Sequence, residues 1–410
     1  MDFNDTPEEA AFRKEAIAFL DSAAERRKPN EILGYRRGQD RPGALEDAKA
    51  FQTKKAEAGF AGIAWPKEWG GRGGTGIQQV IYDQEEAKFN VGTKFFTIGL
   101  SMCIPTVCKW GTQEHIDRFV GPALRADEVW CQLFSEPAGG SDLAALRTRA
   151  DRDGDDWIVN GQKIWTSGAH YSDWGVLVTR TDFDAPKHKG LTYFFIDMKS
   201  PGVEIRPIRQ ISGSSHFNEV FFNDVRIPDS QRLGNIGEGW KVALTTLMNE
   251  RFSIGEAVGP DVDELIRVAR EIDTADGPAI DDPAVQEKIA EWYVRGEGLK
   301  FTRFRAITAL SRGETPGPGS SINKLVMASK LQDISGYGLD LLGMAGPDAS
   351  SDMPLEGIFE EALLYSPSMR IAGGTDEVMR NIIAERVLGL PADIRIDKDV
   401  PFKDIPAGSK

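Results

Sequence analysis

Residues 370–380 read RIAGGTDEVMR, in which a glycine pair and a threonine directly precede two acids and a predicted helix. Glycines allow positive φ and close approach of the backbone to a ligand, and the first N–H groups of a helix attract anions. We therefore expect the loop around Gly373, Gly374 and Thr375 to hold an anion or a ligand oxygen.

A second segment with chemical potential is CQLFSEPAGGSDLAALRTRA at 131–150, where glycines stand beside serines. Their unhindered N–H and O–H donors suit a phosphate or the edge of a heteroaromatic ring. The segment NGQKIWTSGAHYSDW follows at 160–174 and places an aromatic plane and two hydroxyls, those of Trp165, Thr166 and Ser167, in one strand or turn. A buried tryptophan in a sandwich core is the alternative interpretation of that segment.

A carboxylate occupies an apolar stripe in LTTLMNERFSIGEAVG at 244–259. At helical spacing Ala243, Leu247, Glu250 and Ile254 share one face, and only Glu250 is polar. Burial raises the pKa of a carboxyl group, and a base tuned nearer neutrality suits proton abstraction. Glu250 is therefore a candidate general base, and the alternative is a structural ion pair with a buried arginine.

The run GRGGTG at 71–76 matches the G-x-G-x-x-G pattern of dinucleotide-binding loops. Such a site needs a hydrophobic strand immediately before the glycines. The preceding residues are WPKEWG, which is typical of a turn. We therefore predict a glycine loop between helices.

Composition narrows the class of protein. The chain has 410 residues, 40% of them hydrophobic, and a net charge of -14, which argues against nucleic acid as a partner. Its three cysteines show no metal-ligand spacing, so we expect no metal site. The first residues, MDFNDTPEEAAFRKE, lack the apolar core of a signal peptide, and no run of eighteen apolar residues occurs. We expect a cytoplasmic protein without a membrane span.

The elements that must position these residues follow in the order helices, strands, helices. A cap at Asp5–Glu9 with an apolar stripe from Phe12 to Leu20 opens the first block. Short β-branched or aromatic segments then alternate with turn residues and end at Pro228, and helical periodicity returns until about Leu390. The strand segments are DWIVNGQKIW, DWGVLVTRTD, GLTYFFIDM, GVEIRPI and NEVFFNDVRIP. We predict an α+β fold with domains at 1–126, 127–234 and 235–392 and a tail at 393–410.

Taken together, these segments resemble the acyl-CoA dehydrogenase family. SEPAGGSD looks like its first signature and GQKIWTSG is similar to its flavin-contacting strand. The segments WPKEWGGRGG, GNIGEGW and GGTDEVMRNIIAERVLG also fall where that family has them, so the resemblance covers nearly the whole chain. It implies an all-helical N-terminal domain, a middle β-domain of two packed sheets and a C-terminal four-helix bundle. It also implies one FAD per active site and a homo- or heterotetramer.

The resemblance assigns roles to individual residues. Trp165 would flank the isoalloxazine, and Ser141 would lie near the FAD phosphate and the pantetheine arm. Thr375 and Glu377 would contact the FAD of a neighbouring subunit's site or of their own. The implied FAD contacts are Leu133, Phe134, Ser135, Gly140, Ser141, Trp165, Thr166, Ser167, Thr375 and Glu377. The implied substrate contacts are Ser141, Arg251, Gly373 and Gly374.

The implied reaction is α,β-dehydrogenation of an acyl-CoA thioester, in which a carboxylate removes the α-proton and flavin N5 takes the β-hydride. Many members carry the base just before the Gly-Thr of the C-terminal loop, where this chain has Gly373. Other members carry it on the helix after the β-domain, in an E-R pair that Glu250 and Arg251 match. Glu250 is therefore the expected base. Arg251 is a CoA contact or one half of a surface ion pair, and an electron-transferring flavoprotein is the expected acceptor.

Two family stretches are altered. The usual Arg-x-Phe-Gly after this helix is replaced by an acidic insert, so Arg267 or Arg270 would have to substitute, and the Gln-x-x-Gly-Gly stretch reads as Asp340 to Met344. These departures resemble members that act on bulky or sterol-side-chain CoA esters, some of them heterotetramers. Two alternatives follow: a non-catalytic or half-site subunit of a heterotetramer, and a flavin oxidase or monooxygenase on the same fold.

Overall fold

The computed structural model of the chain describes residues 5–27, 40–253, 259–312, 319–343, 357–394 and 397–405. The chain divides into two compact units, which we call the helical unit and the β-unit. The helical unit comprises Met1–Leu45, Thr75–Gly92 and Ile254–Ala392. The β-unit comprises Glu46–Gly74, Thr93–Ser253 and Asp393–Lys410. The domain boundaries given from the sequence stay a prediction.

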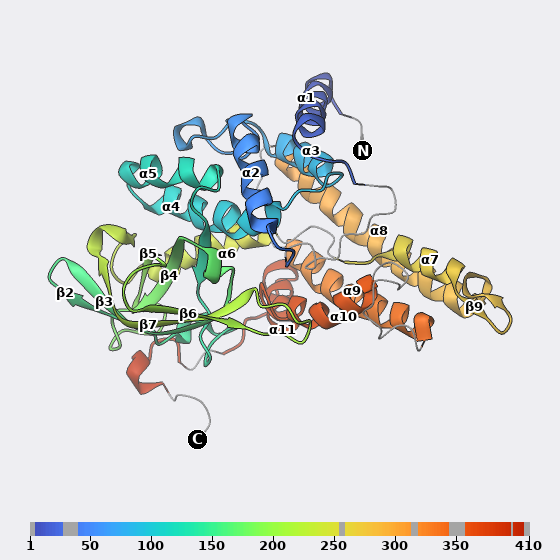
Figure 1. Cartoon of the computed structure of the whole chain (residues 1–410). Helices are drawn as coiled ribbons and strands as arrows, with labels where there is room; N and C mark the ends of the chain where they lie inside the picture. The colour runs from blue at the N-terminus through green and yellow to red at the C-terminus, as the bar shows by residue number, and fades with distance from the viewer. Residues whose placement is uncertain are drawn as a thin grey trace. The chain divides into compact units, whose positions relative to one another are not determined.

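Helices build most of the helical unit (Figure 1). They are α1 (Pro7–Ala23), α3 (Gly76–Glu86), α7 (Val262–Glu271), α8 (Pro283–Ser311), α9 (Ser320–Leu342), α10 (Ile358–Met369) and α11 (Asp376–Ile382). A π-helical turn at Ile383–Val387 extends α11, and the two-residue strands β9 (Asp273–Thr274) and β10 (Gly277–Pro278) form a hairpin between α7 and α8.

The start of α1 follows from its first residues. Thr6 accepts a hydrogen bond from the Glu9 amide at 3.2 Å, and the Glu9 carboxylate accepts one from the Thr6 amide at 2.7 Å. Pro7 fits the first helical position, because its missing N–H would have no helical partner there. The helix start predicted at this cap is confirmed.

The predicted four-helix bundle is formed by α7 to α10, which share one apolar core. Leu265 of α7, Trp292 of α8, Ile334 of α9 and Phe359 of α10 are all buried in it. The approach of α9 to α10 is close, since a Cβ on Gly338 would lie 2.3 Å from the Phe359 ring. Only glycine permits that contact.

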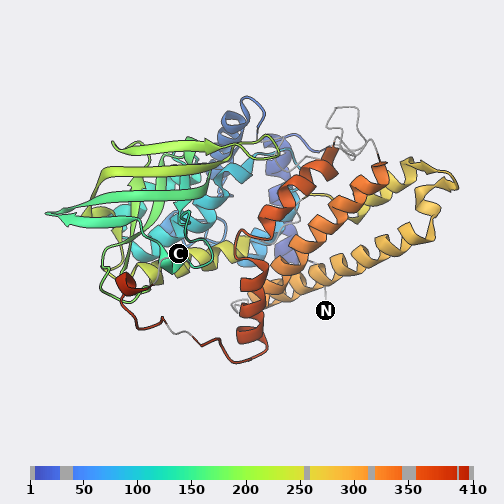
Figure 2. The ribbon, with the colours of Figure 1, turned by 90° about the horizontal axis from the view of Figure 1, so that it is seen from below.

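Strands and four helices build most of the β-unit. The strands are β1 (Trp130–Leu133), β2 (Arg149–Asp153), β3 (Asp156–Ser167), β4 (Trp174–Arg180), β5 (Leu191–Asp197), β6 (Val203–Ile208), β7 (Phe217–Pro228) and β8 (Arg232–Leu233). The helices are α2 (Ala44–Glu57), which begins at the unit boundary, α4 (Ile104–Trp110), α5 (Gln113–Leu124) and α6 (Gly239–Ser253). Figure 2 shows the long strands, in green and yellow-green, lying side by side.

The strands run in the order β6-β7-β3-β2-β4-β5-β8, and β1 pairs with β4 in parallel. The β6-β7-β3-β2 half joins the β4-β5-β8 half through one residue pair, Arg149 and Arg180. Side chains from both halves, such as Val159 and Leu177, share a single core. The predicted packing of two β-layers is therefore present, and the layers are continuous at that one pair.

Residues of β4 and β5 alternate between two cores. Val176 and Tyr193 lie in the core shared with α4, α5 and α6, whereas Leu177 and Phe194 face the β3–β7 side. This alternation follows from the two-residue period of a strand. Because both faces are covered, β4 and β5 form a rigid centre for the β-unit.

The glycine run at 71–76 is a connecting loop, as predicted. Residues Lys67–Trp69 form a 3-10 turn before it, and Thr75, within the run, caps α3. A Cβ on Gly71 would lie 2.4 Å from the Trp65 carbonyl oxygen, so the loop needs glycine to fold back on that turn. The strand that a dinucleotide fingerprint requires is replaced here by the 3-10 turn.

Two kinds of feature are absent from the described residues. None of the described helices is both long and apolar enough to cross a bilayer. No group of three or more His, Cys, Asp or Glu side chains within the described part of the chain could hold a metal ion. Cys103, Cys108 and Cys131 are buried free thiols.

Candidate functional site

The two glycine- and serine-containing segments of the β-unit lie beside each other. The loop that begins at Phe134 leaves the end of β1, and the Ile164 amide of β3 donates a hydrogen bond to the Ser135 carbonyl at 2.9 Å. The segments SEPAGGSD and GQKIWTSG are therefore joined by the backbone at the positions where the sequence predicts a ligand site.

A buried ion pair fastens the same two segments. Lys163 Nζ of β3 lies 2.8 Å from Glu136 Oε1, and the two side chains are 0% and 7% exposed. Lys163 also donates to the Phe134 carbonyl at 3.0 Å. The amides of Arg147 and Thr148 donate to the Glu136 carboxylate at 2.6 and 2.8 Å. Glu136 and Lys163 were not among the residues predicted from the sequence, although each is a charged residue inside one of the two motifs.

The ion pair keeps Glu136 ionised inside the protein. Burial by itself raises the pKa of a carboxyl group. The Lys163 ammonium and the donors from Thr148 and Arg147 outweigh that effect and hold the pKa of Glu136 below its ordinary value of 4.5. The carboxylate is therefore a fixed structural anion rather than a proton carrier.

β3 is irregular at Trp165. The pairing with β7 shifts register between Lys163 and Thr166, and Trp165 adopts a φ of 61°. Positive φ is unfavourable for a bulky L-residue and is found mostly where the surroundings impose it for function. The Trp165 ring is 55% exposed and touches only the edge of Phe217 at a centroid distance of 6.1 Å among the ring contacts described. An apolar plane is thus presented on the surface of the β-unit.

Thr166, the next residue, is 2% exposed, and its hydroxyl has no hydrogen-bond partner among the described residues. A buried hydroxyl without a partner costs about 1–3 kcal/mol. Its backbone is held in place, because Asn218 Nδ2 donates to the Thr166 carbonyl at 2.9 Å. The half-buried Ser167 follows. An aromatic plane and an unsatisfied hydroxyl at one bulge suit a planar ligand with a polar edge.

The other predicted contacts of this segment divide into two kinds. Gly140 and Ser141 are exposed, beyond a tight turn in which Glu136 and Gly139 exchange two backbone hydrogen bonds. Leu133 and Phe134 are buried residues, so the surface that this segment offers to a ligand comes mainly from the exposed pair. Ser135 has intermediate burial.

Helix α6 is anchored to the β-unit by buried hydroxyls. Thr246 Oγ1 lies 3.0 Å from Thr106 Oγ1 and 2.8 Å from the Tyr193 hydroxyl, and all three residues are fully buried. The Tyr193 ring meets the Phe134 ring edge-on at 5.9 Å. This network connects α6 to the residue that precedes Ser135, and the sequence analysis missed it because hydroxyls in a helix give no pattern.

Glu250 and Arg251 lie in α6, and their side chains are outside the part of the chain that the structure describes. Position 250 is one turn after Thr246, on the helix face that includes the buried Ala243. Leu247 of the same face packs against the core. The sequence-predicted base is therefore carried by a helix that the hydroxyl network fixes one turn earlier.

The C-terminal loop belongs to the helical unit. Gly373 and Gly374 have φ of 67° and 102°, which favour glycine. Lys324 of α9 donates to the Gly374 carbonyl. The Thr375 hydroxyl caps α11 by accepting from the Val378 amide at 3.2 Å, which leaves its own proton for another acceptor.

An ion pair closes the C-terminal loop. Arg370 Nη2 lies 2.6 Å from Asp376 Oδ2, and Asp376 is buried. Glu377 points outward, with an exposed side chain. Its own amide and the Thr375 hydroxyl lower the pKa of Glu377. The loop therefore presents two glycine peptides and an exposed carboxylate at the start of α11.

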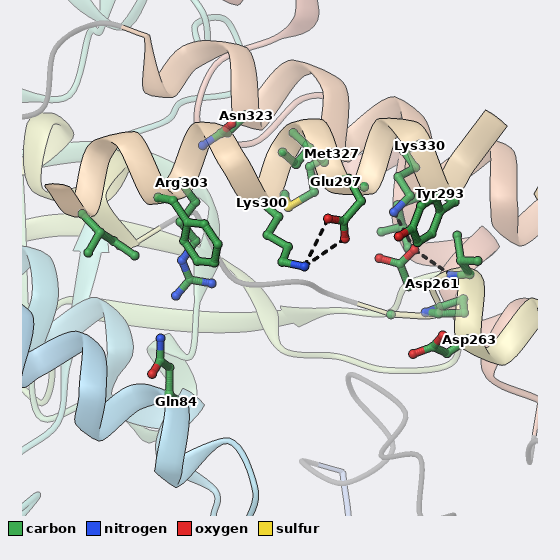
Figure 3. Close-up of a pocket in the computed structure, with 18 residues that line it drawn as sticks. Gln84, Asp261, Asp263, Tyr293, Glu297, Lys300, Arg303, Asn323, Met327 and Lys330 are labelled. Atoms are coloured by element: carbon green, nitrogen blue, oxygen red, sulfur yellow. Dashed lines mark hydrogen bonds and ion pairs between the residues drawn. The ribbon is translucent and has the colours of Figure 1, made fainter. Parts of the chain in front are cut away.

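A cavity of about 500 Å³ lies inside the helical unit, between α3, α7, α8 and α9 (Figure 3). Its charged side chains pair with one another: Lys300 with Glu297 at 3.0 Å and Lys330 with Asp261 at 2.5 Å. Arg303 and Asp263 also line the cavity, so its lining has three cationic side chains and three carboxylates in total. The lining has no excess charge that would select a phosphate or a carboxylate.

The arginines proposed as substitutes for the family's pyrophosphate clamp lie on the last turns of α7. Arg267 is half-buried and Arg270 is exposed. The stretch from Asp340 closes α9 at Leu342, and Met344 lies outside the described residues.

Comparison with known proteins gives matches over nearly the whole chain. The N-terminal, middle and C-terminal domains of acyl-CoA dehydrogenases match residues 6–127, 131–225 and 237–388. The acyl-CoA dehydrogenase IpdE1 of Mycobacterium tuberculosis is 36% identical over 86% of this chain and 90% of its own length. The acyl-CoA dehydrogenase FadE34 of the same organism is 39% identical over 85% of this chain, which spans only 47% of FadE34. The chain thus covers about half of that relative's length.

Among solved structures, the ChsE4-ChsE5 complex from Mycobacterium tuberculosis has the same fold. Its similarity is a TM-score of 0.78 at 27% sequence identity, covering 96% of this chain and all of the matched chain. The helical, β and helical segments of the sequence therefore correspond to one known architecture, and the predicted fold class is confirmed.

The buried ion pair yields a test of stability. We expect Lys163→Met to lower the free energy of unfolding by about 3–5 kcal/mol, because it leaves Glu136 charged and unpaired inside the protein. The double variant Glu136→Gln/Lys163→Met should lose less than Lys163→Met alone. Lys199→Met is the control, since it breaks an exposed pair with Asp173 and should cost at most about 1 kcal/mol. Urea unfolding at pH 7 measures all four proteins, and equal losses in Lys163→Met and Lys199→Met would contradict the role of the pair.

The same pair has a defined pH dependence. The pKa of Glu136 is lower in the folded chain than its ordinary value of 4.5, so the pair stabilises fully above pH 4.5. That stabilisation is lost as pH falls through the folded pKa. The stability difference between wild type and Glu136→Gln should therefore shrink in urea unfolding between pH 6 and about pH 3. A constant difference over that range would be the opposite result.

Proposed function

The chain belongs to the acyl-CoA dehydrogenase family, and from this membership we propose that it catalyses the α,β-dehydrogenation of an acyl-CoA thioester with FAD. Members of this family are FAD-dependent oxidoreductases. One observation carries the proposal for this chain. At the bulge in β3, an exposed Trp165 ring in a strained backbone adjoins the buried, unpartnered Thr166 hydroxyl.

The residues at that bulge suit a flavin. The isoalloxazine is a plane with polar atoms along one edge, so it can stack beside the Trp165 ring and satisfy the Thr166 hydroxyl. Ser135 and Ser167 are half-buried neighbours that offer further hydroxyls. When bound, FAD supplies the hydride acceptor for the β-hydrogen of the substrate. The polypeptide orients both reactants and moves the α-proton.

We assign the α-proton to Glu250. Three observations support this choice: Gly373 has no side chain to act as base, α6 is held by the Thr246 network, and position 250 follows Thr246 by one turn. Ala243 and Thr246, earlier on the same helix face, are buried.

Four residues are proposed substrate contacts. Gly373 and Gly374 offer backbone N–H groups without a Cβ in the way, and such donors stabilise a thioester oxygen that gains negative charge. Exposed Ser141 would contact the pantetheine arm and the FAD phosphate, and Arg251 the CoA phosphates. Thr375 and Glu377 remain proposed FAD contacts of their own or a neighbouring subunit. We also propose a tetramer in the cytoplasm that passes its electrons to an electron-transferring flavoprotein.

Removing the base tests the mechanism. We expect Glu250→Gln to bind FAD like wild type and to slow flavin reduction by acyl-CoA about 1,000-fold or more, because the α-proton loses its acceptor. Anaerobic bleaching of flavin absorbance against short, branched and polycyclic acyl-CoAs measures the rate. Glu238→Gln, the same chemical change just before α6, is the control and should reduce normally. Undiminished reduction in Glu250→Gln would refute the assignment.

A second test addresses the flavin site. Thr166→Val keeps the side-chain shape and removes a hydroxyl that has no partner in the described chain. We expect the apoprotein to unfold at the same temperature or higher, while the Kd for FAD rises about tenfold. The control is Thr179→Val, which removes a buried hydroxyl that donates to the Thr192 carbonyl at 3.4 Å. That control should lower apoprotein stability and leave FAD affinity unchanged, and the reverse pattern would exclude Thr166 from the flavin site.

A specific observation favours one other function, that of a partner subunit. The chain spans half of FadE34, and the ChsE4-ChsE5 structure is a complex of two proteins. Gly373 and the replaced Arg-x-Phe-Gly stretch agree with a chain that completes its FAD site with a different subunit.

Flavin content distinguishes the two functions. We expect the purified chain, of 45.1 kDa, to form a tetramer with one FAD per chain, because it carries both the β3 bulge and Glu250. Absorbance at 450 nm and light scattering give flavin content and mass. A chain that binds little or no FAD until a second acyl-CoA dehydrogenase-like chain is added would instead establish the partner-subunit function.

A further inference from the structure

The segment 397–405 folds back onto the β-unit, although it lies beyond residue 388, where the last matched domain ends. The Phe402 amide donates to the Ala185 carbonyl and the Lys403 amide to the Phe183 carbonyl, both at 3.0 Å. Phe402 is 2% exposed. The segment is therefore docked through its backbone and through one buried aromatic ring.

Phe402 covers a buried cation. The guanidinium of Arg180 lies over the Phe402 ring, 3.4 Å from the centroid, and Arg180 is fully buried. Within the described residues, Arg180 has no carboxylate in ion-pair contact, and its Nη1 has no hydrogen-bond partner. Burial lowers the pKa of Arg180 to about 10. The face of an aromatic ring attracts such a cation, most strongly when water is excluded.

Arg180 in turn holds the chain that follows the SEPAGGSD turn. Its Nε donates to the Leu146 carbonyl at 3.0 Å, and its Nη2 donates to the Ala144 carbonyl at 2.6 Å. Nη2 also donates to the Lys187 carbonyl at 3.2 Å. One guanidinium thus ties residues 144–146 to the β4–β5 loop.

A second connection reaches the turn itself. Lys187 Nζ lies 3.0 Å from Asp142 Oδ2 and 2.6 Å from Asp397 Oδ2. Asp142 directly follows Ser141, and Asp397 opens the docked segment. The ammonium therefore bridges the exposed loop and the C-terminal segment.

We propose that Phe402 and Asp397 are positioning residues for the loop 139–146, which presents Gly140 and Ser141. Without Phe402, water reaches the Arg180 guanidinium and competes for its bonds to Ala144 and Leu146. The loop then adopts other conformations, and Ser141 is no longer pre-organised to contact the pantetheine arm and the FAD phosphate. The assignment of a ligand to Ser141 depends on the proposed function. The link from Phe402 and Asp397 to the loop 139–146 depends only on the contacts described above.

Hydrogen exchange of the full-length protein tests the link without using activity. In Phe402→Ala, we expect peptides within 139–148 to exchange about tenfold faster, while peptides of β6 and β7 exchange as in wild type. Asp397→Asn should give a smaller change in the same peptides, and it provides the test if Phe402→Ala does not fold. Faster exchange of the segment 397–405 in a variant would show that the segment has come off the β-unit. If peptides within 139–148 still exchanged as in wild type, the proposal would be overturned.

Steady-state kinetics separates positioning from general stability. We expect Phe402→Ala to raise the KM for acyl-CoA about tenfold with kcat within about twofold, because binding geometry is lost and the base is untouched. Phe402→Trp keeps a ring face over Arg180 and should restore KM, whereas Phe402→Leu keeps only the apolar volume and should not. Lys403→Met is the control, since Lys403 pairs only with exposed Asp184 among the described ion pairs.

The outcomes have distinct meanings. Equal KM values in Phe402→Leu and Phe402→Trp, or a fall in kcat alone, would overturn the positioning role. Wild-type protein that reduces no flavin with any acyl-CoA would refute the proposed function, and the exchange experiment would still decide whether the segment holds the loop.

Discussion

The ion pair between Lys163 and Glu136 is the constraint on which the site depends. Two opposite charges buried 2.8 Å apart are tolerable only together, and only when their remaining hydrogen bonds are satisfied. The Phe134 carbonyl and the Arg147 and Thr148 amides satisfy them here. The SEPAGGSD loop can therefore move relative to β3 only by exposing or separating the charges. Ser135 and Trp165 lie within two residues of the pair, so it fixes both.

The two cores of the β-unit connect this pair to the helices by continuous side-chain packing. Because β4 and β5 are covered on both faces, their side chains connect the β3–β7 layer to α4 and α6. Tyr193 illustrates the connection, since its ring touches Phe134 and its hydroxyl meets Thr246. The helix that carries the proposed base and the loop that carries the proposed flavin contacts are thus parts of one packed unit, which also holds Trp165 at a positive φ.

Local structure was predicted best where a residue type favours one particular conformation or hydrogen bond. The Thr6 cap, the glycine loop at 71–76 and the strand segments ending at Pro228 follow from hydrogen-bonding capacity, φ and two-residue periodicity. The loop residues that could do chemistry were also chosen from the sequence, because glycines there stand beside hydroxyls, and their roles stay predictions. Thr375 shows the limit of this reasoning. Its hydroxyl was expected to face a ligand, and in the structure it accepts a hydrogen bond that caps α11.

By itself, the sequence determined the order of elements, the family and which loops carry donors, since these depend on neighbours along the chain. Tertiary structure alone decided which distant side chains meet. Glu136 and Lys163 are separated by most of β2 and β3, and Phe402 and Arg180 by more than half of the chain. No local pattern predicts such pairs, because burial, desolvation and register are set only when the strands and the C-terminal segment have packed.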